Sequence, residues 1–320
     1  MSIFPTFDHT CPMDLAQTTG LSTIRDWVRW AASQFNDAGL CFGHGTDNAL
    51  DEALALVLHA LHLDHSLPEE FLDCRVTSTE KKRIGEYLKQ RLEQHIPLAY
   101  ITHEAHFAGL SFYVNDDVLV PRSPIAELIL QGFEPWLQVD GQLRILDLCT
   151  GSGCIAIACA HYLPDALLDA SDISPSALDV ARVNVERHQL HDRVSLYRSD
   201  VFDDIPAQRY DLIVSNPPYV SQEEMAGLPD EYGYEPALGL EAGEDGMDIV
   251  ARILCAAGNF LKPGGIIIME VGESMDYLLR RYPRVPFLWL DFTHGGNGVF
   301  LLTAEQVKQY EQDFLGECNE

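Results

Sequence analysis

Apolar residues in the first hundred positions recur at intervals of three and four, which is the spacing of helices that bury one side. The pattern predicts helices that begin near Ser22 or Thr23, near Asp47, and near Thr77 or Ser78. Short helices this close together in sequence pack best as a bundle. We therefore expect residues 1–99 to form a small helical domain.

Strand-like alternation replaces the helical spacing between residues 100 and 120. Residues 106–114 and 118–120 flank the turn-forming run Asn115-Asp116-Asp117, which favours a β-hairpin that links two domains. A helix is expected directly after this linker, opening at Pro121-Arg122-Ser123-Pro124.

From residue 142 onward, apolar strands alternate with helices, and the first strand leads into a glycine-rich turn. The expected strands cover residues 143–148, 167–172, 194–197, 211–215 and 265–270, followed by an antiparallel pair at 287–292 and 298–303. Alternating strands and helices imply an α/β fold with a mainly parallel, doubly wound sheet. The pattern thus predicts a Rossmann-like, seven-stranded domain over residues 121–320.

The strand over residues 211–215 ends in an unusual polar motif, Asn216-Pro217-Pro218-Tyr219. Two prolines cannot extend a strand, because they lack the N–H that the ladder needs. The Asn216 carboxamide, the Pro217 carbonyl and the Tyr219 ring are therefore expected just outside the carboxyl end of the strand, where open α/β sheets bind ligands. A proline turn with a chance asparagine cap is the alternative without function.

Three acidic or glycine-rich positions also follow strands. The turn Asp147-x-x-x-Gly151-x-Gly153 opens a helix, and its glycines allow a ligand to approach the backbone closely. Asp172 can accept both hydroxyls of a ribose, although it could equally cap the helix at Ser174-Pro175. Asp200 can accept from an adenine amino group or be an ordinary loop residue. Together these positions describe an adenosyl pocket, which fits S-adenosylmethionine.

The chain is strongly acidic, with a net charge of −28 from 49 acidic and 21 basic residues. Such a field repels phosphate backbones and attracts basic proteins, although it could serve solubility alone. Residues 221–251, directly after the proline motif, contain no lysine or arginine. We expect a basic protein partner and no direct DNA binding.

No apolar run is long enough to span a membrane, no signal peptide is evident, and the cysteines show no CxxC pair. Cys154 and Cys159 lie among small apolar residues, as expected of reduced, buried thiols. We expect a cytoplasmic protein without a metal site.

The motifs Asp147-Leu148-Cys149-Thr150-Gly151-Ser152-Gly153, Asp172 and Asn216-Pro217-Pro218-Tyr219 resemble those of class I methyltransferases that modify a planar nitrogen. With the helical N-terminal domain and the hairpin linker, nearly the whole chain resembles the HemK/Prm family of protein glutamine N5-methyltransferases. Pro121-Arg122-Ser123-Pro124 and the following Glu127 differ from the Pro-Arg-Pro-Glu-Thr of the release-factor enzymes. This version, with residues 234–240, is similar to the branch that modifies the third protein of the large ribosomal subunit.

The resemblance implies S-adenosylmethionine as the cofactor and a substrate-recognition role for the helical domain. The implied cofactor residues are Asp147, Cys149, Thr150, Gly151, Ser152, Gly153, Asp172, Ile173, Asp200, Val201 and Asn216. The implied substrate residues are Asn216, Pro217, Pro218, Tyr219, Arg122 and Glu127, the last two being alternatively a linker salt bridge. Cys149 replaces the usual first glycine and Val201 an aromatic residue, so the partner that stacks on adenine stays open. Glu270, at a strand end, is expected to be structural.

The implied chemistry addresses a weak nucleophile, because the lone pair of an amide nitrogen is delocalised into its carbonyl. The Asn216 side-chain oxygen and the Pro217 carbonyl are expected to accept hydrogen bonds from the two N–H groups of the amide. This arrangement favours pyramidal geometry at the nitrogen. Those bonds strengthen as positive charge develops there. Tyr219 is expected to pack on the planar amide, and no strong base is required before transfer.

Three other functions share parts of this pattern. Release-factor enzymes methylate glutamine with the same chemistry, and adenine-N6 methyltransferases also act on a planar nitrogen. The absence of a basic segment near Asn216 argues against a nucleic-acid substrate. A non-catalytic cofactor-binding protein would bind without transfer. The target glutamine, the oligomeric state and the assembly state of the substrate are not encoded in these motifs, although free or nascent protein suits the acidic segment.

Overall fold

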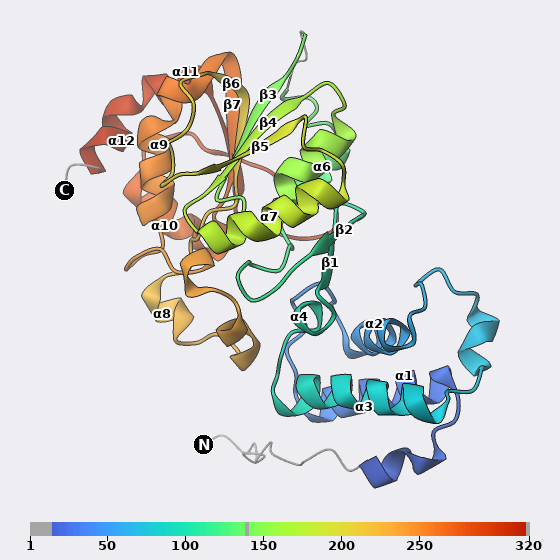
Figure 1. Ribbon diagram of the computed structural model, residues 1–320. Coiled ribbons are helices and arrows are strands. Elements are labelled where there is room, and N and C mark those ends of the chain that lie inside the picture. Colours follow the sequence, from blue (N-terminus) through green and yellow to red (C-terminus); the bar gives the residue numbers. More distant parts are fainter. Residues whose placement is uncertain (1–14, 138–140, 318–320) are drawn as a thin grey trace, which may run out of the picture. The chain divides into compact units, whose positions relative to one another are not determined.

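The computed structural model describes residues 15–137 and 141–317 and divides into two compact units (Figure 1). Of the described residues, those up to His103 form the helical unit together with Pro229–Tyr234. The other described residues, from Glu104 to Leu228 and from Glu235 onward, form the sheet unit. A short segment that follows the proline motif in sequence thus belongs to the helical unit.

The three predicted helices of the helical unit are confirmed. Thr23 caps the first and Thr77 caps the third, each in a capping box that satisfies backbone N–H groups at the helix start. Trp27, Phe35 and Leu56 are among the side chains that fill the core between the helices. The helices are α1 (Ile24–Asp37), α2 (Ala49–Leu61), α3 (Ser78–Glu93) and α4 (Leu98–Thr102), with 3₁₀ turns η1 (Leu15–Gly20) and η2 (Glu69–Asp73).

A buried arginine joins the later segment to this helical core. Arg91 on α3 is 1% exposed and pairs with Glu52 of α2 and, at 3.2 Å, with Glu231. Arg91 also donates to the Cys41 carbonyl at 2.8 Å, and the Cys41 N–H donates to Glu231 at 2.9 Å. Glu231 lies in η3 (Asp230–Tyr234), so buried ion pairs hold this turn within the helical unit.

The sheet unit begins with the predicted hairpin, but the predicted turn is wrong. Strands β1 (Glu104–Phe107) and β2 (Leu110–Tyr113) pair antiparallel around Ala108 and Gly109, which both have positive φ. A tight hairpin needs this backbone geometry, and Gly109 adopts it without strain. Asn115 instead forms a local turn with Asp117 after β2, and residues 118–120 form no strand.

The main sheet has seven strands in the order β5-β4-β3-β6-β7-β9-β8. It is parallel from β5 through β7, and β9 and β8 complete it antiparallel, which confirms the predicted α/β architecture. The strands are β3 (Arg144–Leu148), β4 (Leu167–Asp172), β5 (Val194–Arg198), β6 (Tyr210–Ser215), β7 (Leu261–Glu270), β8 (Leu288–Trp289) and β9 (Val299–Thr303).

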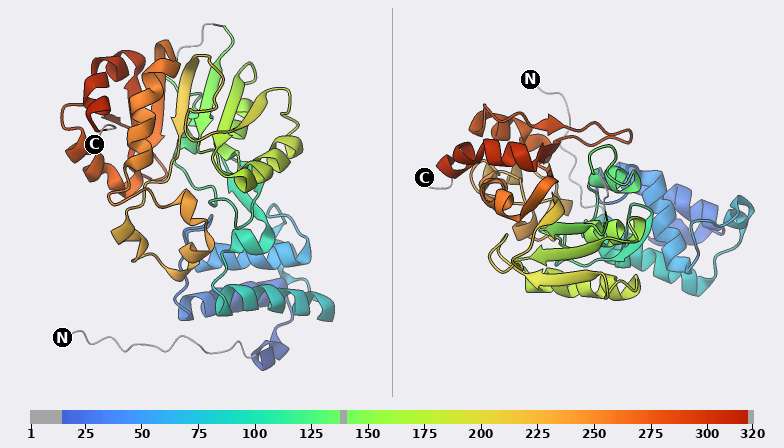
Figure 2. Two further views of the ribbon diagram at one scale, coloured as in Figure 1. Left: turned by 60° about the vertical axis from the view of Figure 1, so that its left-hand side comes forward. Right: turned by 90° about the horizontal axis from the view of Figure 1, so that it is seen from above.

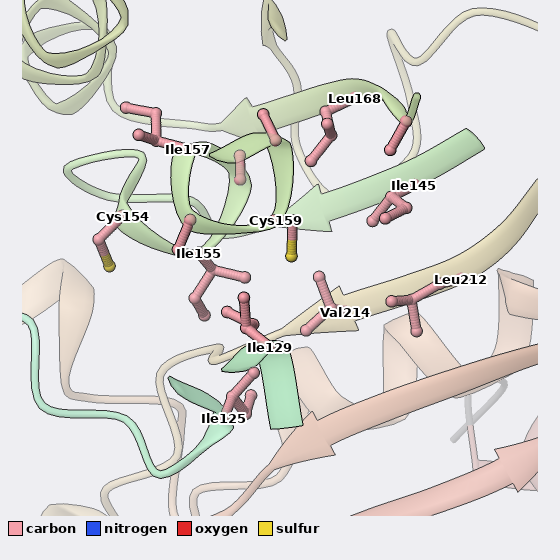
Figure 3. Close-up of a cluster of buried hydrophobic side chains, with 14 of the residues drawn as sticks. Ile125, Ile129, Ile145, Cys154, Ile155, Ile157, Cys159, Leu168, Leu212 and Val214 are labelled. Carbon is pink, nitrogen blue, oxygen red and sulfur yellow. The ribbon is translucent and has the colours of Figure 1, made fainter. Parts of the chain in front are cut away.

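Helices cover both faces of the sheet because successive strand residues point to opposite sides. Leu212 and Val214 pack toward α5 and α6 (Figure 3), whereas Ile213 packs in the core on the opposite face. One face is covered by α5 (Ile125–Leu130), α6 (Cys154–Tyr162) and α7 (Pro175–Arg187). The other carries α9 (Asp248–Phe260), α10 (Met275–Arg281), α11 (Ala304–Gln309) and α12 (Glu311–Glu317). Short turns complete the chain: α8 (Gln222–Met225), η4 (Ala237–Gly239) and η5 (Gly272–Ser274).

Strand register aligns the residues that follow the central strands. Leu148 of β3 is paired with Ser171 of β4 and with Ser215 of β6, and Ser215 is paired with Met269 of β7. The next residue on each strand therefore lies at the same carboxyl edge. These residues are Cys149, Asp172, Asn216 and Glu270.

Candidate active site

A cavity opens at this carboxyl edge and gathers most of the residues that the sequence predicts for the cofactor. Its wall includes Cys149, Thr150, Gly151, Ser152, Asp172, Ile173, Asp200, Val201 and Asn216. Segments near the start of α5 and on α9 contribute Arg122, Ser123 and Arg252. Asp147 and Gly153 are not part of this wall; their contacts lie within the protein.

Asp147 organises the glycine-rich turn from inside the protein. Its Oδ2 accepts from the Thr150 hydroxyl at 2.5 Å and from the Ala156 N–H at 3.1 Å. Its Oδ1 is buried and has no hydrogen-bond partner in the described structure. Burial raises the pKa of Asp147 to about 7, against the lowering effect of those two donors. Asp147 therefore shapes the glycine-rich turn, and its predicted part in cofactor binding stays a prediction.

The two glycines of the turn have different roles. Gly151 (φ +54) lines the cavity, and a Cβ there would meet no protein atom within 4 Å. A side chain at Gly151 would therefore take space that a ligand can use. Gly153 (φ +80) faces α7 instead, where a Cβ would lie 3.3 Å from that of Ala181. Cys149 and Val201, the two departures from the family pattern, also have positive φ, at 57° and 54°.

Asp172 accepts backbone hydrogen bonds with both of its carboxylate oxygens, whereas Ser174 is the cap of α7. Asp172 Oδ1 accepts from the N–H of Ser174, the N-cap residue of α7, at 2.9 Å, and its Oδ2 accepts from the Gly151 N–H at 2.9 Å. Burial raises the pKa of Asp172, and these backbone donors oppose the rise. A carboxylate oxygen has a second lone pair for a ligand hydroxyl. The residues of the wall therefore fit a ribose at this edge.

Asp200 pairs with Arg252 of α9 across 2.8 Å, and both side chains line the cavity. Sequence reasoning missed Arg252, although it is the first basic residue after the long acidic segment. Ile173, 44% exposed, and Val201 add aliphatic surface to the same wall. This end of the cavity offers a guanidinium and aliphatic groups to a flat aromatic ring.

The proline motif divides between the cavity and the interior. Asn216 and Pro218 line the cavity, whereas Pro217 is buried and the half-buried Tyr219 is not part of the wall. The Tyr219 hydroxyl donates to Glu270 Oε1 at 2.9 Å. The Tyr219 backbone carbonyl accepts from the Ser274 hydroxyl at 2.8 Å. The predicted stacking of Tyr219 on a substrate amide stays a prediction.

Glu270 occupies the centre of a buried hydrogen-bond chain. Its Oε2 accepts from the Ser123 hydroxyl at 2.5 Å and its Oε1 accepts from Tyr219. Burial raises the pKa of Glu270, while both hydroxyl donors lower it. Glu270 thus joins the proline motif to the segment before α5 through these two hydrogen bonds.

Close packing leaves the Tyr219 segment little freedom. A Cβ at Gly272 would lie 2.7 Å from the Tyr219 ring, and one at Gly246 would lie 2.2 Å from the Tyr219 carbonyl oxygen. Only glycine allows these approaches. The motif is therefore held from several sides at the edge of the sheet.

Arg122 and Glu127 do not pair with each other. Arg122 forms a two-pronged ion pair with Glu235, with both N–O distances 2.7 Å, and Glu235 also accepts from the Val120 N–H at 3.0 Å. Glu127 lies outside the cavity wall and binds the N–H of Thr293. Sequence spacing could not reveal these partners, because Glu235 follows Arg122 by 113 residues.

Several acids of the segment 221–251 are engaged internally rather than offered to a partner. Glu231 and Glu235 are buried in ion pairs, and Glu224 closes the capping box of α8 with Ser221. The exposed acids of this segment are Glu223, Asp230, Glu241, Glu244 and Asp248.

Within residues 15–137 and 141–317, no group of three or more histidine, cysteine or acidic side chains has a metal-binding arrangement. The same part of the chain has no helix that is both long enough and apolar enough to cross a membrane. Cys154 and Cys159 are buried free thiols, as the sequence predicts.

The strand order, the glycine-rich turn and the aligned polar edge define a class I methyltransferase fold. The family model described as "Methyltransferase small domain" matches residues 127–228, and "PrmC N-terminal domain" matches residues 26–102.

Three curated relatives carry the name ribosomal protein uL3 glutamine methyltransferase. That of Xanthomonas campestris is 50% identical over 92% of this chain and 96% of its own length. That of Neisseria gonorrhoeae is 48% identical over 90% and 96%, and that of Francisella tularensis is 45% identical over 92% and 94%. The chain belongs to the family of ribosomal protein uL3 glutamine methyltransferases.

Proposed function

We propose that this enzyme transfers a methyl group from S-adenosylmethionine to the side-chain amide nitrogen of a glutamine in ribosomal protein uL3. The observation that carries the proposal is the position of Asn216, which lines the same cavity as Gly151 and Asp172. The relatives named for this reaction support the substrate. We place the reaction in the cytoplasm, where ribosomal proteins are synthesised.

The cavity residues supply binding and orientation. Asp172 takes the ribose hydroxyls, Gly151 admits the ligand close to the backbone, and Asp200 with Arg252 contacts the base. When bound, S-adenosylmethionine supplies a methyl group that is already activated on a sulfonium. The protein's own contribution is then to position the acceptor nitrogen, since alignment alone can lower a barrier by several kcal/mol.

Asn216 and Pro217 act on the acceptor amide. The Asn216 side-chain oxygen and the Pro217 carbonyl accept the two N–H bonds of the glutamine, which localises the nitrogen lone pair. These bonds strengthen as the nitrogen becomes positive, so they stabilise the transition state more than the ground state. The extra proton leaves to solvent after transfer, and no buried base is needed. Tyr219, held by Glu270, covers the amide.

A substrate competition tests this proposal. Purified enzyme and labelled S-adenosylmethionine are incubated with unmethylated uL3, with a peptide-chain release factor and with DNA in separate reactions. We expect label in uL3 alone. Asn216→Ala should lower the rate by about 100-fold or more, as loss of a transition-state hydrogen bond does, with cofactor affinity within a few-fold. Label in DNA, or normal turnover by this variant, would overturn the proposal.

A further inference from the structure

A second hollow of the sheet unit adjoins the cofactor cavity. One side is formed by α5 and the other by the loop between β8 and β9, which lies beside α5 in the right-hand view of Figure 2. Arg122 and Ser123 line both this groove and the cavity. The groove therefore begins at the wall of the candidate active site. We call it the α5 groove.

The walls of the α5 groove are fastened to each other. Glu127 of α5 accepts from the Thr293 N–H at 3.0 Å, from the Thr293 hydroxyl at 2.9 Å and from the His294 N–H at 3.4 Å. Gly296 (φ +98) lies against Pro124, and a Cβ there would stand 2.7 Å from the Pro124 Cβ. Hydrogen bonds and close packing thus fix the loop at a set distance from α5.

The groove surface is mainly small and uncharged. Ala108, Pro124, Ala126, Leu130 and Gly295 contribute to it, and Leu130 is 54% exposed. The two charged side chains have internal partners, since Glu127 binds the loop and Arg122 binds Glu235. The groove therefore suits an uncharged polypeptide stretch with small or apolar side chains, rather than a highly charged one.

A short chain of contacts joins this groove to the proline motif. Ser123, at its inner end, donates to Glu270, which in turn accepts from Tyr219. A polypeptide that presents a glutamine at Asn216 must continue past the cavity wall. We propose that the α5 groove binds the segment of the substrate protein next to its target glutamine. This inference rests on the proposed glutamine methylation and assigns the groove as its substrate-docking surface.

Matched leucine variants test the groove. Leu130→Arg places a charge on the groove wall, and Leu279→Arg places the same charge on an exposed leucine of α10 outside both hollows. We expect Leu130→Arg to raise KM for uL3 by about 5- to 20-fold, the size of a lost apolar contact plus a buried unpaired charge. For both variants, kcat and the Kd for S-adenosylmethionine should stay within about two-fold of wild type.

A photo-crosslinking residue at position 130 provides a second measurement that does not depend on rate. Mixed with uL3, it should capture the tryptic peptide that contains the methylated glutamine, whereas the same residue at position 279 should not. Equal KM values for the two arginine variants, or a crosslink to a distant part of uL3, would overturn the inference. Failure of the proposed function itself is distinguishable, because wild-type enzyme would then leave uL3 unlabelled.

Discussion

The Tyr219 hydroxyl donates a 2.9 Å hydrogen bond to Oε1 of Glu270, which links the motif after β6 to the last residue of β7. Glu270 is buried and also accepts from Ser123. The proline motif is therefore positioned by the neighbouring strand as well as by its own prolines.

We expect Tyr219→Phe and Glu270→Leu each to lower kcat by about ten-fold or more, because a hydrogen bond to a charged group contributes about 1.5–3 kcal/mol. The double variant should be little worse than either single one, since both changes remove the same interaction. Steady-state kinetics with uL3 and S-adenosylmethionine measures this coupling. Fully additive losses in the double variant would show that Glu270 does not act through Tyr219.

Arg252 should contribute to cofactor affinity. Its ion pair with Asp200 lies in the cavity wall, and removal of the guanidinium leaves the carboxylate without that partner. We expect Arg252→Gln to raise the Kd for S-adenosylmethionine by about 3- to 10-fold at unchanged kcat under saturation. Arg280→Gln on α10, whose guanidinium lies over the Tyr277 ring, is the control. Calorimetric titration that gives the same Kd for both variants would contradict this assignment.

The stability of the sheet unit should depend on the ionisation of Asp147. Burial raises its pKa to about 7 in the folded protein, from an ordinary value of about 3.8. The unfolded state then releases this proton first as the pH rises, so the contribution of Asp147 to the free energy of unfolding falls between about pH 4 and pH 7. Above pH 7 the loss levels off.

Asparagine does not ionise, so Asp147→Asn removes this contribution to the pH dependence of stability. Urea unfolding at pH 5 and pH 8 should show the stability difference between wild type and variant shifting in favour of the variant at the higher pH, by up to about 2.7 kcal/mol, since two pH units lie between pH 5 and the folded pKa of about 7 and each contributes about 1.36 kcal/mol. A difference that does not change with pH would show that Asp147 ionises normally in the folded chain.

The buried Arg91 should stabilise the helical unit strongly. Arg91→Met leaves the carboxylates of Glu52 and Glu231 without their cation, which costs about 3–5 kcal/mol. Arg25→Met, which removes an exposed pair with Asp73, should cost far less than Arg91→Met, because solvent screens exposed charges. Denaturant unfolding followed by the fluorescence of Trp27 and Trp30 measures both, and similar losses would refute the assigned role of Arg91.

Local patterns predicted most of the fold. The helix caps at Thr23, Thr77 and Ser174 and the apolar strands of the main sheet are encoded in adjacent residues, and these elements form as expected. The hairpin turn was misplaced because Asn115-Asp116-Asp117 has turn chemistry too, and only the left-handed backbone at Ala108 and Gly109 decides between the two sites.

Only the site residues that directly follow a strand could be predicted from the sequence. Asp172 and Asn216 follow apolar runs, so their place at the sheet edge was foreseeable. The partners Arg252, Glu235 and Glu270 come from other elements, and which side chains meet depends on strand register and loop packing. The acidic segment shows the same limit, because Glu231 and Glu235 resemble solvated charges in sequence and are buried in the structure.

Mass spectrometry of uL3 from cells that lack this enzyme tests the central claim most directly. Complementation with the wild-type gene should restore one methyl group on a single uL3 glutamine, and complementation with Asn216→Ala at equal protein abundance should not. A methylated uL3 in the deletion strain, or full restoration by Asn216→Ala, would contradict the account.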